Sequence, residues 1–103
     1  MSEAIPHLEA SVRVDPSSAE IQNNLGSALS SAGRHADAEA RFREAVRLKP
    51  GYAKAHFNLA TALYHQGRYG EARSEAEKAQ ALGYQTPRTF LDLLSARAAE
   101  PAR

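Results

Sequence analysis

The sequence predicts an all-α fold in which pairs of helices stack into a short solenoid. Three observations lead to this prediction. The phrase NNLGSALSSAG, from Asn23 to Gly33, returns 34 positions later as FNLATALYHQG, from Phe57 to Gly67. Each period holds two stretches with apolar residues at helical spacing, and no stretch alternates polar and apolar residues as a strand does. The chain of 103 residues, 43% of them hydrophobic, can also bury one core of modest size.

The repetition extends over almost the whole chain and suggests how it is divided. The opening segment aligns with the second half of the period, because Val12 and Pro16 fall on Val46 and Pro50. We therefore expect half a repeat at residues 2–18, whole repeats at 19–52 and 53–86, and a capping or half-repeat helix at 87–100. The whole repeats align Ala19 with Ala53, Asn24 with Asn58, Leu25 with Leu59, Ala28 with Ala62, Leu29 with Leu63, Gly33 with Gly67, Ala38 with Ala72, Ala45 with Ala79 and Leu48 with Leu82.

The first elements can be placed from their breakers. The first helix is predicted to begin near Glu3, because Pro6 is tolerable only in a first turn. In the first whole repeat, apolar residues at helical spacing run from Ile21 to Leu29, and Gly33 then interrupts them. The spacing resumes after this glycine and stops at Pro50. Each repeat is thus a helix, a tight turn and a second helix.

The next boundaries follow from the same logic. Gly33 and Gly67 lie where a helix must end and turn back, a place where a residue without a Cβ takes the left-handed conformation at little cost. The dipeptide Thr86-Pro87 predicts a helix start in which the Thr hydroxyl caps the helix and Pro takes the first helical position.

This pattern resembles the tetratricopeptide repeat family, whose period is 34 residues. Small residues such as Gly26 and Ala38 stand where two helices of a pair would cross, and Leu25, Leu29 and Phe42 supply the volume between them. The residues that carry the resemblance are Asn24, Leu25, Gly26, Leu29, Gly33, Ala38, Phe42, Ala45 and Pro50, with most of their counterparts one period later.

The chain departs from the family pattern at four places. Gln22 and His56 replace the aromatic residue that the family places early in the first helix. The counterpart of Phe42 in the second repeat is Ala76, and Tyr84 stands where the family has a terminating proline. These departures predict a second repeat that packs more loosely or exits at a different angle.

The resemblance implies a right-handed curved array whose inner surface is lined by the first helix of each repeat. It also implies a non-enzymatic protein-protein interaction module that binds an extended peptide in this groove. The polar and aromatic residues left over after the apolar stripe is assigned are the predicted peptide contacts. They are Asn23, Asn24, Ser27, Lys54, Asn58, Thr61, Tyr64 and His65.

Asn24 and Asn58 stand out because they are identical and one repeat apart. An Asn amide offers donors and an acceptor together, as the alternating C=O and N–H groups of an extended peptide require. Similar asparagines form a peptide-binding ladder in the O-linked N-acetylglucosamine transferases, whose repeats this sequence resembles more than those of chaperone adaptors. The alternative is that each Asn bonds to the neighbouring helix or to water.

Chaperone adaptors of the family clamp a peptide C-terminal carboxylate with Lys, Arg and Asn side chains. In this chain Asn58 matches the middle Asn of that clamp, and Arg88 could match a basic member. The remaining places hold Asn23, Ser27 and Asp92, and the last of these would repel a carboxylate. Strong selectivity for an acidic C-terminus is therefore not expected.

Composition argues against several other functions. The net charge of +1, with both signs interspersed, leaves no nucleic-acid or membrane footprint. Cysteine is absent, and no residue pattern matches a catalytic, nucleotide or cofactor motif. Glu39 to Arg43 and Arg73 to Glu77 are expected to be ordinary helix-surface ion pairs. The histidines lack the i, i+4 spacing of a metal site; they are His7, His35, His56 and His65.

The chain ends suggest a second function. Repeat arrays need polar capping helices, and Leu91, Leu93 and Leu94 would occupy more of the last helix than one docking face needs, as would Phe90 and Ala98. The alternatives to peptide binding are therefore a self-assembling segment or a homo-oligomer through its terminal helices. The resemblance to O-linked N-acetylglucosamine transferases implies a third alternative, a substrate-recruiting part of a larger enzyme such as a glycosyltransferase. The N-terminal sequence shows neither a secretory signal nor a membrane span, so the expected location is the cytoplasm.

Overall fold

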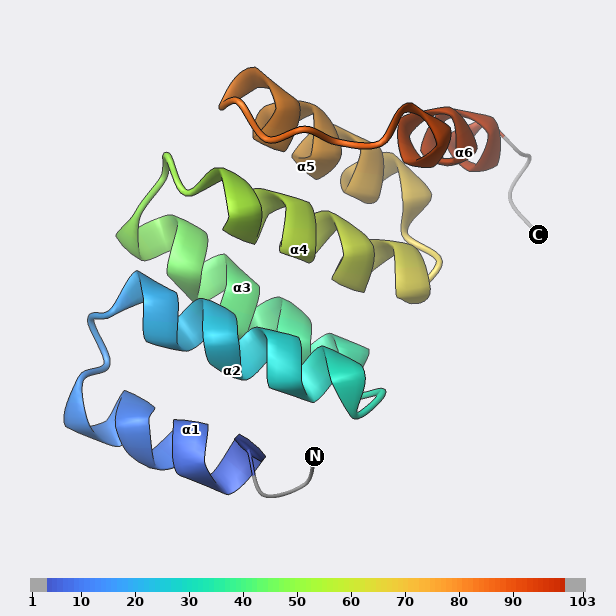
Figure 1. Cartoon of the computed structure of the whole chain (residues 1–103). Helices are drawn as coiled ribbons and strands as arrows, with labels where there is room; N and C mark the ends of the chain where they lie inside the picture. The colour runs from blue at the N-terminus through green and yellow to red at the C-terminus, as the bar shows by residue number, and fades with distance from the viewer. Residues whose placement is uncertain (1–3, 100–103) are drawn as a thin grey trace.

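The computed structural model describes residues 4–99, which form six α-helices and no strand, so the predicted all-α repeat solenoid is confirmed. The helices follow one another up a single stack, with the N-terminus at one end and the C-terminus near the other (Figure 1). Their bounds are α1 (Ala4–Val14), α2 (Ala19–Ser31), α3 (His35–Leu48), α4 (Ala53–His65), α5 (Tyr69–Ala81) and α6 (Arg88–Ala98).

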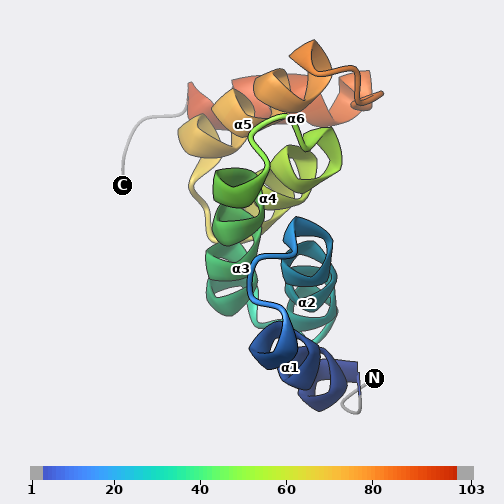
Figure 2. The ribbon, with the colours of Figure 1, turned by 90° about the vertical axis from the view of Figure 1, so that its left-hand side faces the viewer.

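Each helix packs chiefly on its neighbours in the sequence, and successive helices of the repeats alternate between two layers. The first helices of the two repeats, α2 and α4, also contact each other. The second helices, α3 and α5, form the other layer, and α1 lies at the N-terminal end of the stack, against α2 (Figure 2). One side of the α2–α4 layer thus faces α3 and α5, and its other side is left for solvent or a ligand.

Three turns of the same design reverse the chain after α2, α4 and α5. Gly33 and Gly67 have φ angles of 79° and 75°, as predicted, and Gly83 has a φ of 100° at the equivalent place after α5. At the first turn, the N–H of Arg34 donates to the carbonyl oxygen of Leu29 at 2.9 Å, which satisfies an otherwise free helix-end carbonyl. The glycines are therefore required by the backbone conformation.

The start of α6 differs from the prediction that Thr86 caps this helix and Pro87 opens it. The helix begins at Arg88, and Pro87, with φ −57° and ψ 131°, is itself the residue just outside it. The Thr86 Oγ1 atom is buried and has no hydrogen-bond partner among residues 4–99. The prediction was wrong because Pro87 occupies the extended N-cap position, so the hydroxyl lies one residue too early to reach the first free N–H groups.

Other helix boundaries follow from their local sequence. Ser18 caps α2 by accepting a hydrogen bond from the N–H of Ile21 at 3.2 Å. Pro6 lies in the first turn of α1, as predicted, whereas the expected start at Glu3 falls outside the described residues. The connection from α5 to α6 spans residues 82–87, longer than the connection at 49–52 between the two repeats.

The crossing of α2 over α3 depends on a glycine. A Cβ on Gly26 would lie 2.5 Å from atom Cε1 of Phe42, which is closer than real Cβ contacts come. The second repeat solves the same crossing with two small residues, since Ala60 and Ala76 are both fully buried. Each repeat thus balances the sizes of the two residues that meet.

The terminal helices leave less apolar surface uncovered than the sequence suggests. Leu94 is fully buried, and Phe90 and Leu91 pack against the core. At the other end, Ile5 of α1 is buried. Among residues 4–99, the large exposed apolar side chains are Val14, Leu82 and Leu93.

Glu39 holds the two repeats together from α3. Its Oε1 atom accepts hydrogen bonds from Arg68 Nη1 at 2.8 Å and Gln66 Nε2 at 2.9 Å, and its Oε2 atom accepts one from Arg43 Nε at 2.8 Å. Burial alone would raise the pKa of the Glu39 carboxyl, but the hydrogen bonds from Gln66 and Arg43 and the charges on Arg43 and Arg68 lower it. The predicted pair with Arg43 is therefore one part of a contact between repeats.

We expect Gly26→Ala to destabilise the chain and the Phe42→Ala background to remove that cost. The added Cβ forces the ring or the helix to shift, which costs about 1–3 kcal/mol. Once the ring is gone, the same change should gain about 0.5–1 kcal/mol from better helix propensity. Urea unfolding of wild type, Gly26→Ala, Phe42→Ala and the double variant measures both effects. If Gly26→Ala changed the unfolding free energy equally with and without the Phe42 ring, the contact between Gly26 and Phe42 would be contradicted.

We expect Glu39→Gln to cost about 1 kcal/mol of unfolding free energy, the scale of a lost charge-assisted contact. Glu77→Gln is the matched control, because Glu77 pairs only with Arg73, at 3.5 Å and in an exposed position. The contribution of Glu39 to the free energy of unfolding is complete above the ordinary carboxyl pKa of 4.5. It is lost as the pH falls through the lowered pKa of Glu39 in the folded chain. Urea unfolding between pH 3 and pH 7 should therefore converge for wild type and Glu39→Gln at the acidic end; parallel curves would count against this role.

Candidate functional site

The free side of the α2–α4 layer contains a hollow of about 450 Å³. It lies between α2 and α4, with the start of α3 at its base. We call it the groove. Its lining residues are Ser27, Ser30, Ser31, His35, Phe42, Asn58, Thr61 and His65.

The groove brings together four of the predicted peptide contacts: Ser27, Asn58, Thr61 and His65. The other four do not line it. Asn24 and Lys54 are exposed beside it, whereas Tyr64 is half-buried and packs against the hydrophobic core. Asn23 is buried.

The side chain of Asn23 lies between α2 and α4. It is only 1% exposed, and its Oδ1 atom accepts a hydrogen bond of 2.9 Å from Asn58 Nδ2. Asn58 therefore bonds to the neighbouring helix, as the alternative interpretation of the asparagines proposed, while it also lines the groove. Its Oδ1 and its second N–H remain for another partner. Asn24 and Asn58 are equivalent in sequence but have different surroundings.

Two histidines form one end of the groove. The rings of His35, from α3, and His65, from α4, stack with centroids 4.4 Å apart and planes 20° apart. The His35 Nδ1 atom is buried without a hydrogen-bond partner among residues 4–99. Burial lowers the pKa of His65, and the neighbouring His35 lowers it further. The sequence did not indicate this pair, because the two histidines occupy different positions of the repeat.

An aromatic cluster continues the same surface toward α6. The Phe57 ring stacks on Tyr84 at 4.6 Å and meets the edge of Phe90 at 5.6 Å. Tyr64 joins the cluster through Phe90 at 5.8 Å and Tyr69 at 5.7 Å. The inner surface therefore changes from hydroxyl and amide groups on α2 to aromatic rings between α4 and α6.

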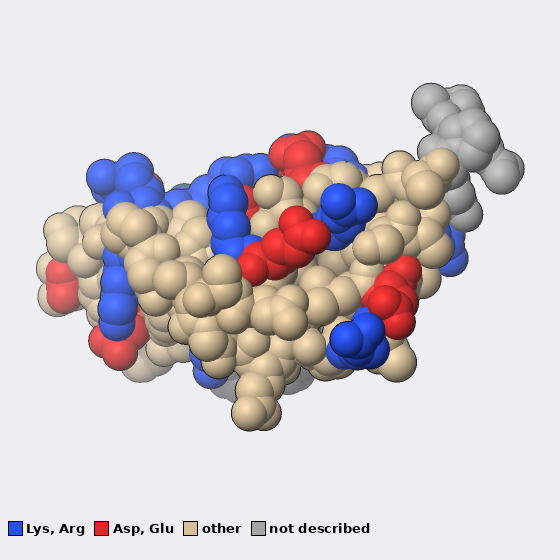
Figure 3. Space-filling view, turned by 90° about the horizontal axis from the view of Figure 1, so that it is seen from above, with Lys and Arg blue, Asp and Glu red and all other residues tan. Residues whose placement is uncertain are grey.

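The lining of the groove contains no Lys, Arg, Asp or Glu. Charged residues lie elsewhere, and seen from the end formed by α5 and α6 both signs are scattered around uncharged surface (Figure 3). Within residues 4–99, no group of three or more His, Asp or Glu side chains could hold a metal ion. In the same range, no helix combines the length and the apolar character needed to cross a membrane. The groove can thus offer hydrogen bonds and apolar contact to a ligand.

Comparisons with known proteins agree with this architecture. A family model described as tetratricopeptide repeat matches residues 2–52 and again 26–85. A solved structure described as the first TPR of Spaghetti (RPAP3) bound to the HSP90 peptide SRMEEVD has a TM-score of 0.90 and 25% identity, covering 96% of this chain and 80% of that one. The Sgt2 TPR domain from Aspergillus fumigatus has a TM-score of 0.87 and 23% identity, covering 99% of this chain and 74% of that one. No curated protein matches significantly.

We expect the His65 ring to titrate below the ordinary pKa of 6.5, and His35→Gln to bring its pKa closer to that value. The folded state favours the neutral His65 ring, so the unfolded chain takes up the proton first and stability falls as pH drops from about 6.5 toward the lowered pKa. NMR titration of the ring protons measures the pKa. Arg73→Gln, at an exposed position of α5, is the control and should leave the pKa of His65 unchanged. An unchanged His65 pKa in His35→Gln would rule out the effect of His35 on His65.

Proposed function

The chain belongs to the tetratricopeptide repeat family, and from this premise we propose that it is a non-enzymatic protein-interaction module whose groove binds an extended segment of a partner protein. A scaffold role and a cytoplasmic location are part of the same proposal. The observation that carries it is the uncharged groove, with hydroxyl, amide and imidazole groups on three helices.

The chemistry of the groove suits a peptide backbone. An extended peptide presents C=O and N–H groups in alternation, and the hydroxyl of Ser27 and the free amide atoms of Asn58 can donate to one and accept from the other. The Thr61 hydroxyl donates to the carbonyl oxygen of Asn58 at 2.7 Å, so it can accept from a peptide N–H. The similar RPAP3 structure holds a peptide, which supports the same ligand class for this chain. Neutral hydrogen bonds contribute about 0.5–1.5 kcal/mol each, so we expect an affinity of about 0.1–1 mM for a short peptide.

The groove should differ from a carboxylate clamp in what it prefers. The peptide in the RPAP3 structure, SRMEEVD, is acidic. In this chain no Lys or Arg lines the groove, Asn23 is buried, and the clamp position on α6 holds Asp92, an exposed carboxylate in place of a cation. We therefore propose that the groove reads the peptide backbone and nearby apolar side chains, with no preference for an acidic C-terminus.

Self-assembly through the terminal helices is the second candidate function. It is favoured by Val14, the last residue of α1, which is 86% exposed, and by Leu93 of α6, which is 36% exposed. Sedimentation velocity over a hundredfold range of protein concentration tests it. A constant monomer would exclude this candidate, whereas association that Leu93→Ser weakens would support it.

We expect the groove to bind SRMEEVD and a counterpart without carboxylates, amidated SRMQQVN, with similar affinity. NMR titration would show shifts at Ser27, Asn58 and Thr61 for both peptides. Ser27→Trp should fill the groove and weaken both peptides, whereas Ser74→Trp, on the exposed surface of α5, should change neither.

Two outcomes would contradict the proposal. Absence of shifts at the groove residues with either peptide at millimolar concentration would remove the binding function. A preference for SRMEEVD of about tenfold, equivalent to 1.4 kcal/mol, would instead show that charge dominates recognition.

A further inference from the structure

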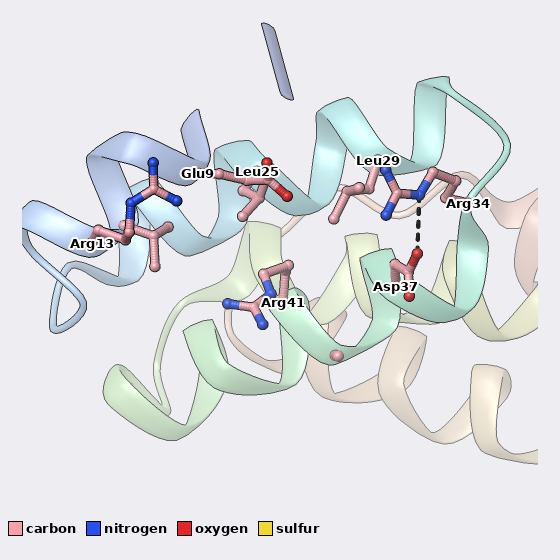
Figure 4. A pocket seen from close by; sticks show the side chains of 9 residues that line it. Glu9, Arg13, Leu25, Leu29, Arg34, Asp37 and Arg41 are labelled. Carbon is pink, nitrogen blue, oxygen red and sulfur yellow. Dashed lines mark hydrogen bonds and ion pairs between the residues drawn. The ribbon is translucent and has the colours of Figure 1, made fainter. Parts of the chain in front are cut away.

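A second hollow, of about 360 Å³, lies on the opposite side of α2 from the groove. It is bounded by α1 on one side and α3 on the other, with α2 between them (Figure 4). We call it the cleft, and it shares no lining residue with the groove. Its lining residues are Glu9, Val12, Arg13, Leu25, Leu29, Arg34, Asp37, Ala40 and Arg41.

The equivalent place one repeat later, between α3 and α5, is bridged by ion pairs. Arg68 Nη1 bonds to Glu39 Oε1 at 2.8 Å, and Arg43 Nη2 lies 3.5 Å from Glu71 Oε2. Both pairs join a residue of α3 to a residue at or beyond the turn that starts α5. They draw these two helices together over Leu59 and Leu63 of α4, which are buried.

The cleft lacks both of these bridges because two residues of α1 differ. Counting back 34 positions, Ile5 stands at the place of Glu39, and an apolar side chain cannot pair with Arg34. Glu9 stands at the place of Arg43 and Asp37 at the place of Glu71, so two groups of the same charge replace the pair of opposite charges in the later repeat. Among residues 4–99, no ion pair joins α1 to α3, and a hollow remains between these helices, although Leu25 and Leu29 in its lining are each only 3% exposed.

The arginines of the cleft still have capacity to bind. Arg34 is paired with Asp37 at 3.0 Å, but Arg41 donates only to the neutral amide oxygen of Gln22, at 3.2 Å. No carboxylate among the described residues lies within ion-pair distance of Arg13. Arg13 and Arg41 project from α1 and α3 at the same end of the cleft, and Leu25 and Leu29 lie between that end and Arg34 (Figure 4).

We propose that this cleft is a second binding site, which takes an acidic and apolar segment of a partner protein. A Glu or Asp carboxylate of the partner would sit between Arg13 and Arg41, because a guanidinium pairs with a carboxylate through two parallel hydrogen bonds. The neighbouring apolar side chain of the partner would fill the hollow against Val12, which is half-buried, and Ala40, which is exposed. The site supplies the cross-helix ion pairs that the chain itself lacks at this repeat.

The direct test uses a capped peptide that alternates glutamate and leucine, and a control peptide in which glutamine replaces each glutamate. Methyl NMR follows Leu25 and Leu29, and the guanidinium Nε–H signals follow Arg13 and Arg41. We expect the glutamate peptide to shift these signals and the glutamine peptide to bind about tenfold more weakly, as expected for the loss of one charge-assisted contact.

A matched pair of variants locates the contact. Arg13→Gln removes an exposed cation of the cleft and should weaken the glutamate peptide about tenfold. Arg47→Gln removes the counterpart of Arg13 one repeat later, which pairs with Glu44, and should leave the affinity unchanged. Neither side chain is part of the core, so both proteins should fold.

Several results would overturn the proposal. Shifts confined to the groove residues Asn58 and Thr61 would place the acidic peptide in the groove, and equal binding of the two peptides would remove the role of charge. Equal shifts by sodium acetate, without any effect of leucine, would leave a simple anion site only. Binding in the groove is monitored by the signals of Asn58 and Thr61 and binding in the cleft by those of Leu25, Leu29, Arg13 and Arg41. Loss of binding at one site is therefore distinguishable from loss of binding at the other.

Discussion

The contact between Gly26 and the ring of Phe42 fixes how α2 is rotated about its own axis, and both candidate sites depend on that rotation. With the Cα of Gly26 against the ring, Leu25 and Leu29 face the cleft between α1 and α3, while Ser27, Ser30 and Ser31 line the groove between α2 and α4. A helix places residues two apart on nearly opposite sides. One close contact in the core therefore decides which residues line the groove and which line the cleft.

In both repeats, a polar side chain of the first helix connects the preceding loop to the second helix, but the charge of its partner in the second helix differs. In the first repeat, Gln22 Nε2 donates to the carbonyl of Pro16 at 3.2 Å, and its Oε1 accepts from Arg41. In the second, His56 Nε2 lies 2.8 Å from the carbonyl of Pro50, and Nδ1 lies 2.8 Å from Glu75 Oε1. These residues replace the expected aromatic. The buried polar groups are satisfied because their partner in the second helix of the repeat changes with them, from Arg41 to Glu75.

This exchange also affects the surface. Arg41 faces the cleft because its partner is a neutral amide, whereas Glu75, its counterpart, is occupied by His56 and by Lys78 at 3.1 Å. Arg41 is thus available as a cation in the first repeat because the neutral amide of Gln22, and no carboxylate, connects it to α2. A core substitution and a candidate binding site are linked through one position of the repeat.

The sequence predicted the features that recur every 34 positions and missed those that do not. Gly33, Gly67 and the small residues at the helix crossings follow from the period, because each repeat solves the same packing problem. The bond between Asn58 and Asn23 and the stack of His35 on His65 join positions that are not equivalent, so comparison of the repeats could not reveal them. Thr86 was misplaced because a dipeptide motif does not state which of its two residues ends the extended segment.

The opposite positions of the groove and the cleft have a thermodynamic consequence. A short array offers few hydrogen bonds on any one surface, and each site alone is expected to bind weakly. Both sites are built on α2, so the distance between them is fixed by one rigid helix. A partner chain long enough to pass around the end of α2 would meet the second site at high effective concentration and gain affinity without any new contact. A partner too short for that path would bind each site independently, because no lining residue is shared.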